Sequence, residues 1–262
     1  MRTLFWQDLT SDDFRGLDPE TTIAVLPIAA IEQHGPHLPV ATDTAIATGM
    51  IVEVVRQCPA DLSILILPVQ AVGKSNEHLR SPGTLTLNWE TAIRAWTEIG
   101  ESVFRAGLRK LILINSHGGN VDPIGIVARE LRVRFGMLVV AAQWSRLGKP
   151  AGLFTDEELS VGIHAGDVET SLMLHFRPDL VRMEKAGNFV PATIAIAKEF
   201  AHLRPTGTTA FGWIAQDLHA AGAAGDASRA TAEKGRQTAE FQAAEFIKLV
   251  RDVAGFRLDR LA

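Results

Sequence analysis

The chain has 262 residues, of which 47% are hydrophobic and 21% charged, so it can bury a sizeable core as ordinary globular proteins do. Its formal net charge of −4 does not favour nucleic-acid or membrane-surface partners, for which a basic face is typical. Because Cys58 is the single cysteine and the N-terminal residues lack the apolar stretch of a secretion signal, we predict a cytoplasmic protein without an internal disulfide.

Short apolar runs alternate with longer segments of helical period, which is the pattern of βα units on a mostly parallel sheet. We predict strands over residues 23–28, 62–69, 110–115 and 137–143, because their Ile, Leu and Val content is typical of strands buried on both faces. These runs are far shorter than the ~20 apolar residues that span a bilayer. We predict helices over residues 43–57, 89–106, 122–135 and 167–175, and a long Ala- and Glu-rich helix from 226 to about 253.

This order of elements predicts a single α/β domain over residues 1–262, since no internal repeat or low-complexity linker interrupts it. Residues 185–225 are different, because Gly, Pro, Thr and Ala follow one another there without a clear period. A segment of that length without a period is typical of a lid or a subunit contact.

Polar clusters follow the predicted strands at the points where the strands end. They read EQHGPH (32–37) followed by Asp43, GKSNEH (73–78), SHGGN (116–120) and, at the start of the fourth helix, HAGDVETS (164–171). Ligands of open α/β sheets bind at the carboxyl ends of the strands, where loops from several strands converge. Five of the eight histidines lie in these clusters, so we predict the functional site there.

The first cluster has the residue types of a metal site. Glu32 and His34 alternate by two positions and point the same way if the segment is extended. Asp43 in isolation would be interpreted as a helix N-cap. Beside Glu32 and His34 it is instead predicted to bridge two ions, an arrangement common in hydrolysis. Mixed nitrogen and oxygen ligands without cysteine favour Zn, Mn or Fe. His37 is predicted to orient a ligand.

The later clusters leave alternatives open. His117 is either a turn histidine ahead of Gly118 and Gly119 or a metal ligand at the strand end. Glu169 is either a capping carboxylate or a metal ligand. His164 is the candidate acid/base group, because imidazole titrates near neutral pH.

The second cluster offers candidate substrate contacts. Glu77 and His78 either touch the substrate or hold the loop through hydrogen bonds to the ligands. The predicted substrate-binding residues are Ser75, Glu77, His78, Gly118 and Gly119.

These motifs, in this order, resemble the creatininase family, which includes creatinine amidohydrolase, formamide deformylases of flavin and deazaflavin biosynthesis, and a mycofactocin-type peptide-maturation peptidase. The resemblance runs from about residue 26 to residue 235. It rests on LPI (26–28), EQHGPHLP (32–39), TDT (42–44), Ser75, EH (77–78), PGT (82–84), NSHGGN (115–120), HAG (164–166), ETS (169–171), GD (225–226) and ATAEKG (230–235).

The resemblance implies a three-layer αβα fold, two divalent metal ions per chain and a homohexamer. Carried over residue by residue, it implies that Glu32, Asp43 and His117 hold one ion. His34 and the bridging Asp43 hold the second ion, and His164 matches the catalytic histidine. Zn is the first candidate for the metal, followed by Mn and Fe.

Two departures from creatininase proper bear on the metals and the substrate. That enzyme has a Tyr-Glu pair directly after the metal-binding histidine, where this chain has Gly118 and Gly119, so we predict that Glu169 replaces the missing carboxylate. It also has a Trp-Asp pair shortly before the catalytic histidine, where this chain has Ser160 and Val161. We therefore predict that creatinine is a poor substrate.

The sequence thus predicts a metal-dependent amidohydrolase that cuts a C–N bond of a small (cyclic) amide or formamide by metal-activated water. His164 would pass a proton to the leaving nitrogen, and backbone N–H groups of Gly118 and Gly119 would assist the oxyanion. Two alternatives stay open, a site that acts on a short peptide and a metal-binding subunit without turnover. The predicted partner is a small amide, with neither nucleic acid nor membrane.

Overall fold

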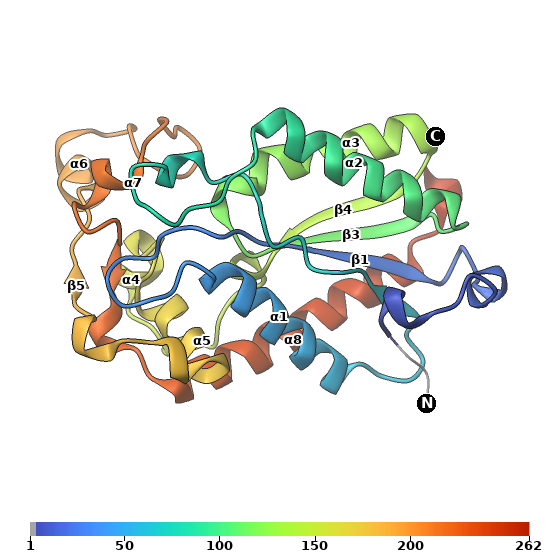
Figure 1. The fold of residues 1–262 in the computed structure, drawn as a ribbon, viewed down its shortest axis with the longest axis horizontal. Helices are drawn as coiled ribbons and strands as arrows, with labels where there is room; N and C mark the ends of the chain where they lie inside the picture. The colour runs from blue at the N-terminus through green and yellow to red at the C-terminus, as the bar shows by residue number, and fades with distance from the viewer. Residues whose placement is uncertain (1–3, 262) are drawn as a thin grey trace.

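A four-stranded parallel sheet forms the centre of the molecule, seen in a computed structural model that describes residues 4–261 (Figure 1). The strands are β1 (Ile23–Ile28), β2 (Ile64–Ile66), β3 (Lys110–Asn115) and β4 (Leu138–Gln143), in the order β2-β1-β3-β4. Ile23 of β1 lies opposite Ile64 on one side and Lys110 on the other. All strands therefore end at the same edge of the sheet.

Helices cover both faces of this sheet (Figure 1). One layer holds α1 (Thr42–Gln57), α5 (Asp167–Phe176) and α8 (Ala232–Gly255), and the other holds α2 (Trp89–Arg105) and α3 (Val121–Phe135). Alternate residues of β1 enter two separate cores, because Val25 packs in the cluster of Phe246 and Leu26 in the cluster of Trp96. The predicted α/β fold with three layers is confirmed.

Pro27 marks the place where β2 leaves the sheet. Its carbonyl accepts a hydrogen bond from the Gln70 amide at 2.9 Å, but a proline has no N–H to return. Regular pairing between β1 and β2 stops at Val25, so the predicted strand over 62–69 is regular only over Ile64–Ile66. The chain beyond it is free to form the loop that carries residues 73–78.

The long C-terminal helix starts later than predicted. Asp226 does not open it, because it pairs with Asn188 in a small antiparallel sheet of β5 (Asn188–Phe189) and β6 (Gly225–Asp226). The N-cap is Thr231, whose hydroxyl accepts from the Lys234 amide at 3.2 Å. The predicted start at residue 226 is therefore wrong.

The irregular segment 185–225 contains more structure than its sequence pattern indicates. Besides β5 it holds the short helices α6 (Thr193–Glu199) and α7 (Ala215–Leu218), and α4 (Asp156–Val161) precedes it. These elements gather at the end of the molecule where the strands end (Figure 1). A role as lid or subunit contact stays a prediction. Within residues 4–261, every helix is too short or too polar to cross a membrane.

In the layer of α1, α5 and α8, the N-terminal end of α8 packs directly against α5. A Cβ atom on Gly235 would lie 1.9 Å from the Ser171 carbonyl oxygen, a distance that only glycine permits. Thr231, just before α8, donates its amide to the Ser171 hydroxyl at 3.1 Å. The N-terminal turn of α8 is thus seated directly on α5.

We predict that Gly235→Ala lowers the free energy of unfolding by about 1–3 kcal/mol, because the added methyl must push the two helices apart. Gly125→Ala is the matched control, since Gly125 is exposed in α3 and its added methyl would meet nothing within 4 Å. That variant should gain about 0.5–1 kcal/mol from helix propensity. Urea unfolding of both proteins measures the difference, and equal stabilities would contradict the contact.

Candidate metal centre

The structure brings the predicted ligands together at the carboxyl edge of the sheet. Glu32 and His34 lie in the loop after β1, and His117 lies directly after β3. Asp43 and Glu169 sit in the first turns of α1 and α5. Their donor atoms form groups in which all atoms lie within 4.8 Å of one another, such as His34 with Asp43 and Glu169.

Asp43 lies between two imidazoles. Its Oδ1 is 3.7 Å from His34 Nε2, and its Oδ2 is 3.6 Å from His117 Nδ1. The N-cap of α1 is Ala41, and no side chain caps that helix. The capping interpretation of Asp43 is therefore wrong, and its two oxygens instead face two different histidines.

In its neutral form, each of these imidazoles turns one unprotonated nitrogen toward the carboxylates. The Nδ1–H of His34 donates to the Glu32 carbonyl oxygen at 3.0 Å, which leaves Nε2 with a lone pair. The Nε2–H of His117 donates to the Lys74 carbonyl oxygen at 3.0 Å, which leaves Nδ1 with a lone pair. Such second hydrogen bonds fix the ring and the tautomer of metal-binding histidines. His117 is thus both a turn histidine and a candidate ligand.

Glu32 is the centre of the histidine cluster. Its Oε1 lies 3.2 Å from His117 Nδ1, 3.4 Å from His78 Nε2 and 3.7 Å from His164 Nδ1. The carboxylate is completely buried.

The unsatisfied atoms of the cluster fit a divalent cation. Both oxygens of Glu32, Nε2 of His34 and Oδ2 of Asp43 are buried without a hydrogen-bond partner. Within residues 4–261 no Lys or Arg lies within 4.0 Å of Glu32, Asp43 or Glu169. Burial of such groups without a partner is costly, and metal coordination is one of the few ways to offset it. The donor set of carboxylates and imidazoles is the one that Zn, Mn and Fe accept.

Burial or neighbouring carboxylates raise the pKa values of Asp43, Glu169 and His117, which favours their protonated forms when no cation is bound. Burial raises the pKa of Asp43 well above its usual value, and the nearby Glu32 carboxylate adds to this. Burial also raises the pKa of Glu169. Burial opposes protonation of His117, but Glu32 and Glu77 outweigh it and hold the pKa of His117 well above normal. Metal binding would displace these protons.

His164 faces the cluster with a lone pair. Its Nε2–H donates to the Gln33 carbonyl oxygen at 2.8 Å, so Nδ1 is the atom turned toward Glu32. Its backbone pairs in both directions with Ala224. Burial, and then the neighbouring His34 imidazole, lower the pKa of His164 to about 4. This value lies below the near-neutral range expected from the sequence.

Glu169 does not cap α5, whose N-cap is Gly166, and its role as a metal ligand stays a prediction. Its Oε2 accepts from the Ala165 amide at 2.6 Å and lies 3.9 Å from His34 Nε2. Ala165 adopts a φ of 55°, which is uncommon for a residue with a side chain. Strain of this kind concentrates at functional sites. The Ala165 turn therefore fixes the Glu169 carboxylate beside His34.

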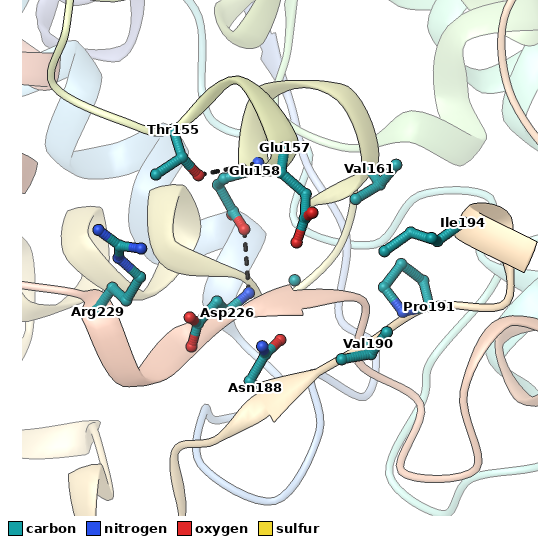
Figure 2. A pocket seen from close by; sticks show the side chains of 11 residues that line it. Thr155, Glu157, Glu158, Val161, Asn188, Val190, Pro191, Ile194, Asp226 and Arg229 are labelled. Atoms are coloured by element: carbon teal, nitrogen blue, oxygen red, sulfur yellow. Dashed lines mark hydrogen bonds between the residues drawn. The ribbon is translucent and has the colours of Figure 1, made fainter.

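Glu158 supports the turn that follows His164, and its sequence pattern did not indicate this role. It is buried in α4, and its carboxylate accepts from the Asp226 amide at 3.0 Å (Figure 2). A Cβ atom on Gly166 would lie 2.3 Å from Glu158 Oε1. In the sequence Glu158 follows Asp156 and Glu157, so nothing distinguishes it from an exposed acidic helix start.

The predicted substrate contacts lie against the ligands. Ser75 Oγ and Glu77 Oε1 are each 3.3 Å from His117 Nε2. His78 faces Glu32, as described above. A Cβ atom on Gly119 would lie 2.1 Å from Glu77 Oε1, whereas Gly118 is exposed. Contact with a substrate stays a prediction for all five residues.

Two asparagines hold the strand-end loops together. Asn115 Oδ1 accepts from the His117 amide at 3.1 Å. Asn120 donates to the Ala29 carbonyl at 3.0 Å and accepts from the Lys74 amide at 2.9 Å, so it joins the loops after three strands. His37 lies outside the candidate ligand groups found in residues 4–261, and its Nε2 is 2.9 Å from the Thr170 hydroxyl, beside Glu169.

Known proteins are similar to this chain in sequence and in fold. The mycofactocin precursor peptide peptidase of Mycobacterium tuberculosis is 34% identical over 225 residues, which cover 81% of this chain and 78% of that protein. The creatinine amidohydrolase of Pseudomonas putida is 32% identical over 187 residues, which cover 65% of this chain and 70% of that protein. Two solved structures, described as creatininase Mn and as a creatininase mutant of Zn-Zn type, each give a TM-score of 0.75 at 26% identity, covering 96% of this chain and 98% of the other.

The family model for creatininase, described as creatinine amidohydrolase, matches residues 7–250, which is nearly the whole chain. The solved creatininases have the same fold along almost their full length. The family predicted from the sequence motifs is confirmed: this chain belongs to the creatininase family.

Proposed function

We propose that this chain is a metal-dependent amidohydrolase that cuts the C–N bond of a small amide or formamide. The observation that carries the proposal is the placement of the Asp43 carboxylate, with one oxygen toward His34 and the other toward His117. Carboxylates placed in this way bridge pairs of metal ions in hydrolytic enzymes.

The donor atoms divide into two sets. Glu32, Asp43 Oδ2 and His117 Nδ1 would hold one ion, as the short distances of His117 Nδ1 to both carboxylates suggest. His34 Nε2, Asp43 Oδ1 and Glu169 form a group with metal-ligand spacing and would hold the other ion. Divalent ions in such sites lower the pKa of water and polarise a carbonyl oxygen. Zn, Mn and Fe suit these ligands, and the Mn and Zn-Zn descriptions of related creatininases support the first two.

His164 is the residue placed to move a proton. Because the Gln33 carbonyl holds its Nε2–H, only Nδ1 is free to take up a proton from the reacting water. The same burial that lowers the pKa of His164 makes its protonated form a stronger acid than an ordinary imidazolium. It would therefore give that proton readily to the leaving nitrogen.

A short peptide is the second candidate substrate, and a specific observation favours it. Several relatives with 31–34% identity to this chain are mycofactocin precursor peptide peptidases. Hydrolysis of a peptide bond needs the same ligands and the same proton transfer as hydrolysis of a small amide. A homohexameric assembly and a cytoplasmic location stay predictions.

A substrate panel decides between these candidates. The metal-loaded protein is offered creatinine, cyclic amides, formamides and short peptides, and products are measured by mass spectrometry. We expect release of an amine from an amide bond and slow turnover of creatinine, because Ser160 and Val161 replace the Trp-Asp pair of creatininase. Rapid creatinine hydrolysis would contradict the pocket interpretation, and hydrolysis of peptides alone would replace the first candidate by the second.

Asp43→Asn tests the bridge. The amide cannot neutralise two cations, so we expect bound metal to fall from near two ions per chain to less than one, and turnover to be lost. At neutral pH, the free energy of unfolding of the metal-free variant should equal or exceed that of the metal-free wild type. The raised pKa of Asp43 means that its carboxylate destabilises the metal-free fold as the pH rises above the unfolded pKa. Asp122→Asn, at an exposed helix start, is the control and should keep both ions.

His164→Ala and Glu169→Gln separate proton transfer from metal binding. Glu169→Gln should lower metal content toward one ion per chain, because it removes an anionic ligand of one set. His164→Ala should keep both ions and lose about 10²–10⁴-fold in turnover, the usual contribution of a general acid/base. Elemental analysis and steady-state kinetics measure both effects. The reverse pattern would exchange the two roles.

A further inference from the structure

Gln33 lies between two candidate ligands in the sequence, and its side chain contacts neither of their donor atoms. It is buried, and its Nε2 lies 2.8 Å from His78 Nδ1 and 2.8 Å from the Gly222 carbonyl oxygen. Its Oε1 accepts from the Gly35 amide at 3.0 Å. Its Nε2 also lies 3.2 Å from His164 Nε2, so two backbone groups and two imidazoles surround the side-chain amide.

The two backbone groups decide which way the amide points. A carbonyl oxygen accepts only and a backbone amide donates only, so the NH₂ group must face Gly222 and the oxygen must face Gly35. The reverse orientation would place oxygen against oxygen and N–H against N–H. The NH₂ group is thus also the group that meets His78.

This orientation decides the tautomer of His78. Its Nδ1 must accept from the Gln33 amide, so a neutral His78 carries its proton on Nε2. That Nε2 lies 3.4 Å from Glu32 Oε1. His78 therefore presents an N–H to the carboxylate and has no lone pair available for a metal on that side.

The backbone of Gln33 has the opposite effect on His164. Its carbonyl takes the Nε2–H of His164, which leaves the Nδ1 lone pair facing the same oxygen of Glu32 at 3.7 Å. The two rings stack with centroids 4.5 Å apart. One residue thus places a donor and an acceptor side by side over Glu32.

We propose that Gln33 is a positioning residue that sets the tautomer of His78, so that His78 turns an N–H, and not a metal-binding lone pair, toward Glu32. An N–H turned toward Glu32 Oε1 at 3.4 Å attracts the carboxylate but leaves its lone pairs open to a cation. Partners of this kind orient ligands, and their loss typically weakens metal binding about 10–100-fold. The proposal rests on the proposed function only for the role of Glu32 as a ligand.

The tautomer is measured directly by nitrogen–proton correlation NMR of the full-length, metal-free protein with labelled histidine, at neutral pH. His78→Gln identifies the His78 signals. We expect the wild type to show the Nε2–H form, and Gln33→Leu to show a mixture of both tautomers. Gln242→Leu is the matched control, because Gln242 is also buried and donates to the Gly148 carbonyl at 3.0 Å, but should leave the His78 signals unchanged. An unchanged tautomer in Gln33→Leu overturns the proposal.

Zn²⁺ titration by calorimetry then tests how the tautomer acts. His78→Gln supplies an NH₂ group where the imidazole had Nε2–H, so it should keep affinity, whereas His78→Leu and Gln33→Leu should each weaken it about 10-fold. The double variant Gln33→Leu/His78→Gln should bind as His78→Gln does. Equal weakening by Gln33→Leu in both backgrounds would show that Gln33 does not act through His78. A chain that binds no Zn²⁺ at all would refute the proposed function, while the NMR result would still decide the tautomer.

Discussion

The structure depends on three carboxylates placed where no lysine or arginine among the described residues is close enough to neutralise them. Glu32 and Asp43 are buried and Glu169 is only 25% exposed, all at the carboxyl edge of one sheet. Within residues 4–261, only histidines come within ion-pair distance of these carboxylates. Charges held in this way need either protons or metal cations, and burial raises the pKa of Asp43, which favours its protonated form when no cation is bound. The chemistry of the site depends on whether protons or metal cations neutralise these carboxylates.

Backbone carbonyl groups fix the orientation of the histidine rings in the site. The rings of His34, His117 and His164 each donate to a carbonyl oxygen, so each presents a lone pair in a fixed direction. Carbonyl groups in loops are themselves fixed by neighbouring strands, and Asn120 joins the loops that hold them. A ligand set built on such contacts is ordered before any cation arrives, which lowers the cost of binding.

The C-terminal third of the chain is part of the site although it carries no candidate ligand. Ala224 pairs with the backbone of His164, and the Gly222 carbonyl holds the Gln33 amide. Lys234 of α8 forms a 2.6 Å ion pair with the buried Asp167, at the start of the helix that carries Glu169. The Lys234 contact gives a physical reason for the ATAEKG motif, and the hydrogen bond from the Asp226 amide to Glu158 gives one for the GD motif.

The sequence by itself determined the layers and where the candidate ligands gather. Strands β1 and β3 have their predicted bounds, because runs of Ile, Leu and Val that are buried on both faces have few other structures open to them. Glu32, His34, Asp43, His117 and Glu169 were predicted as ligands from residue type, from position at strand and helix ends and from the family resemblance, and the structure brings them together. Only the tertiary structure decided the late start of α8, the role of Glu158 and the contacts of Gln33. Each of these depends on a partner far along the chain, such as Asn188 for Asp226 or Gly222 for Gln33, and local pattern carries no information about such partners.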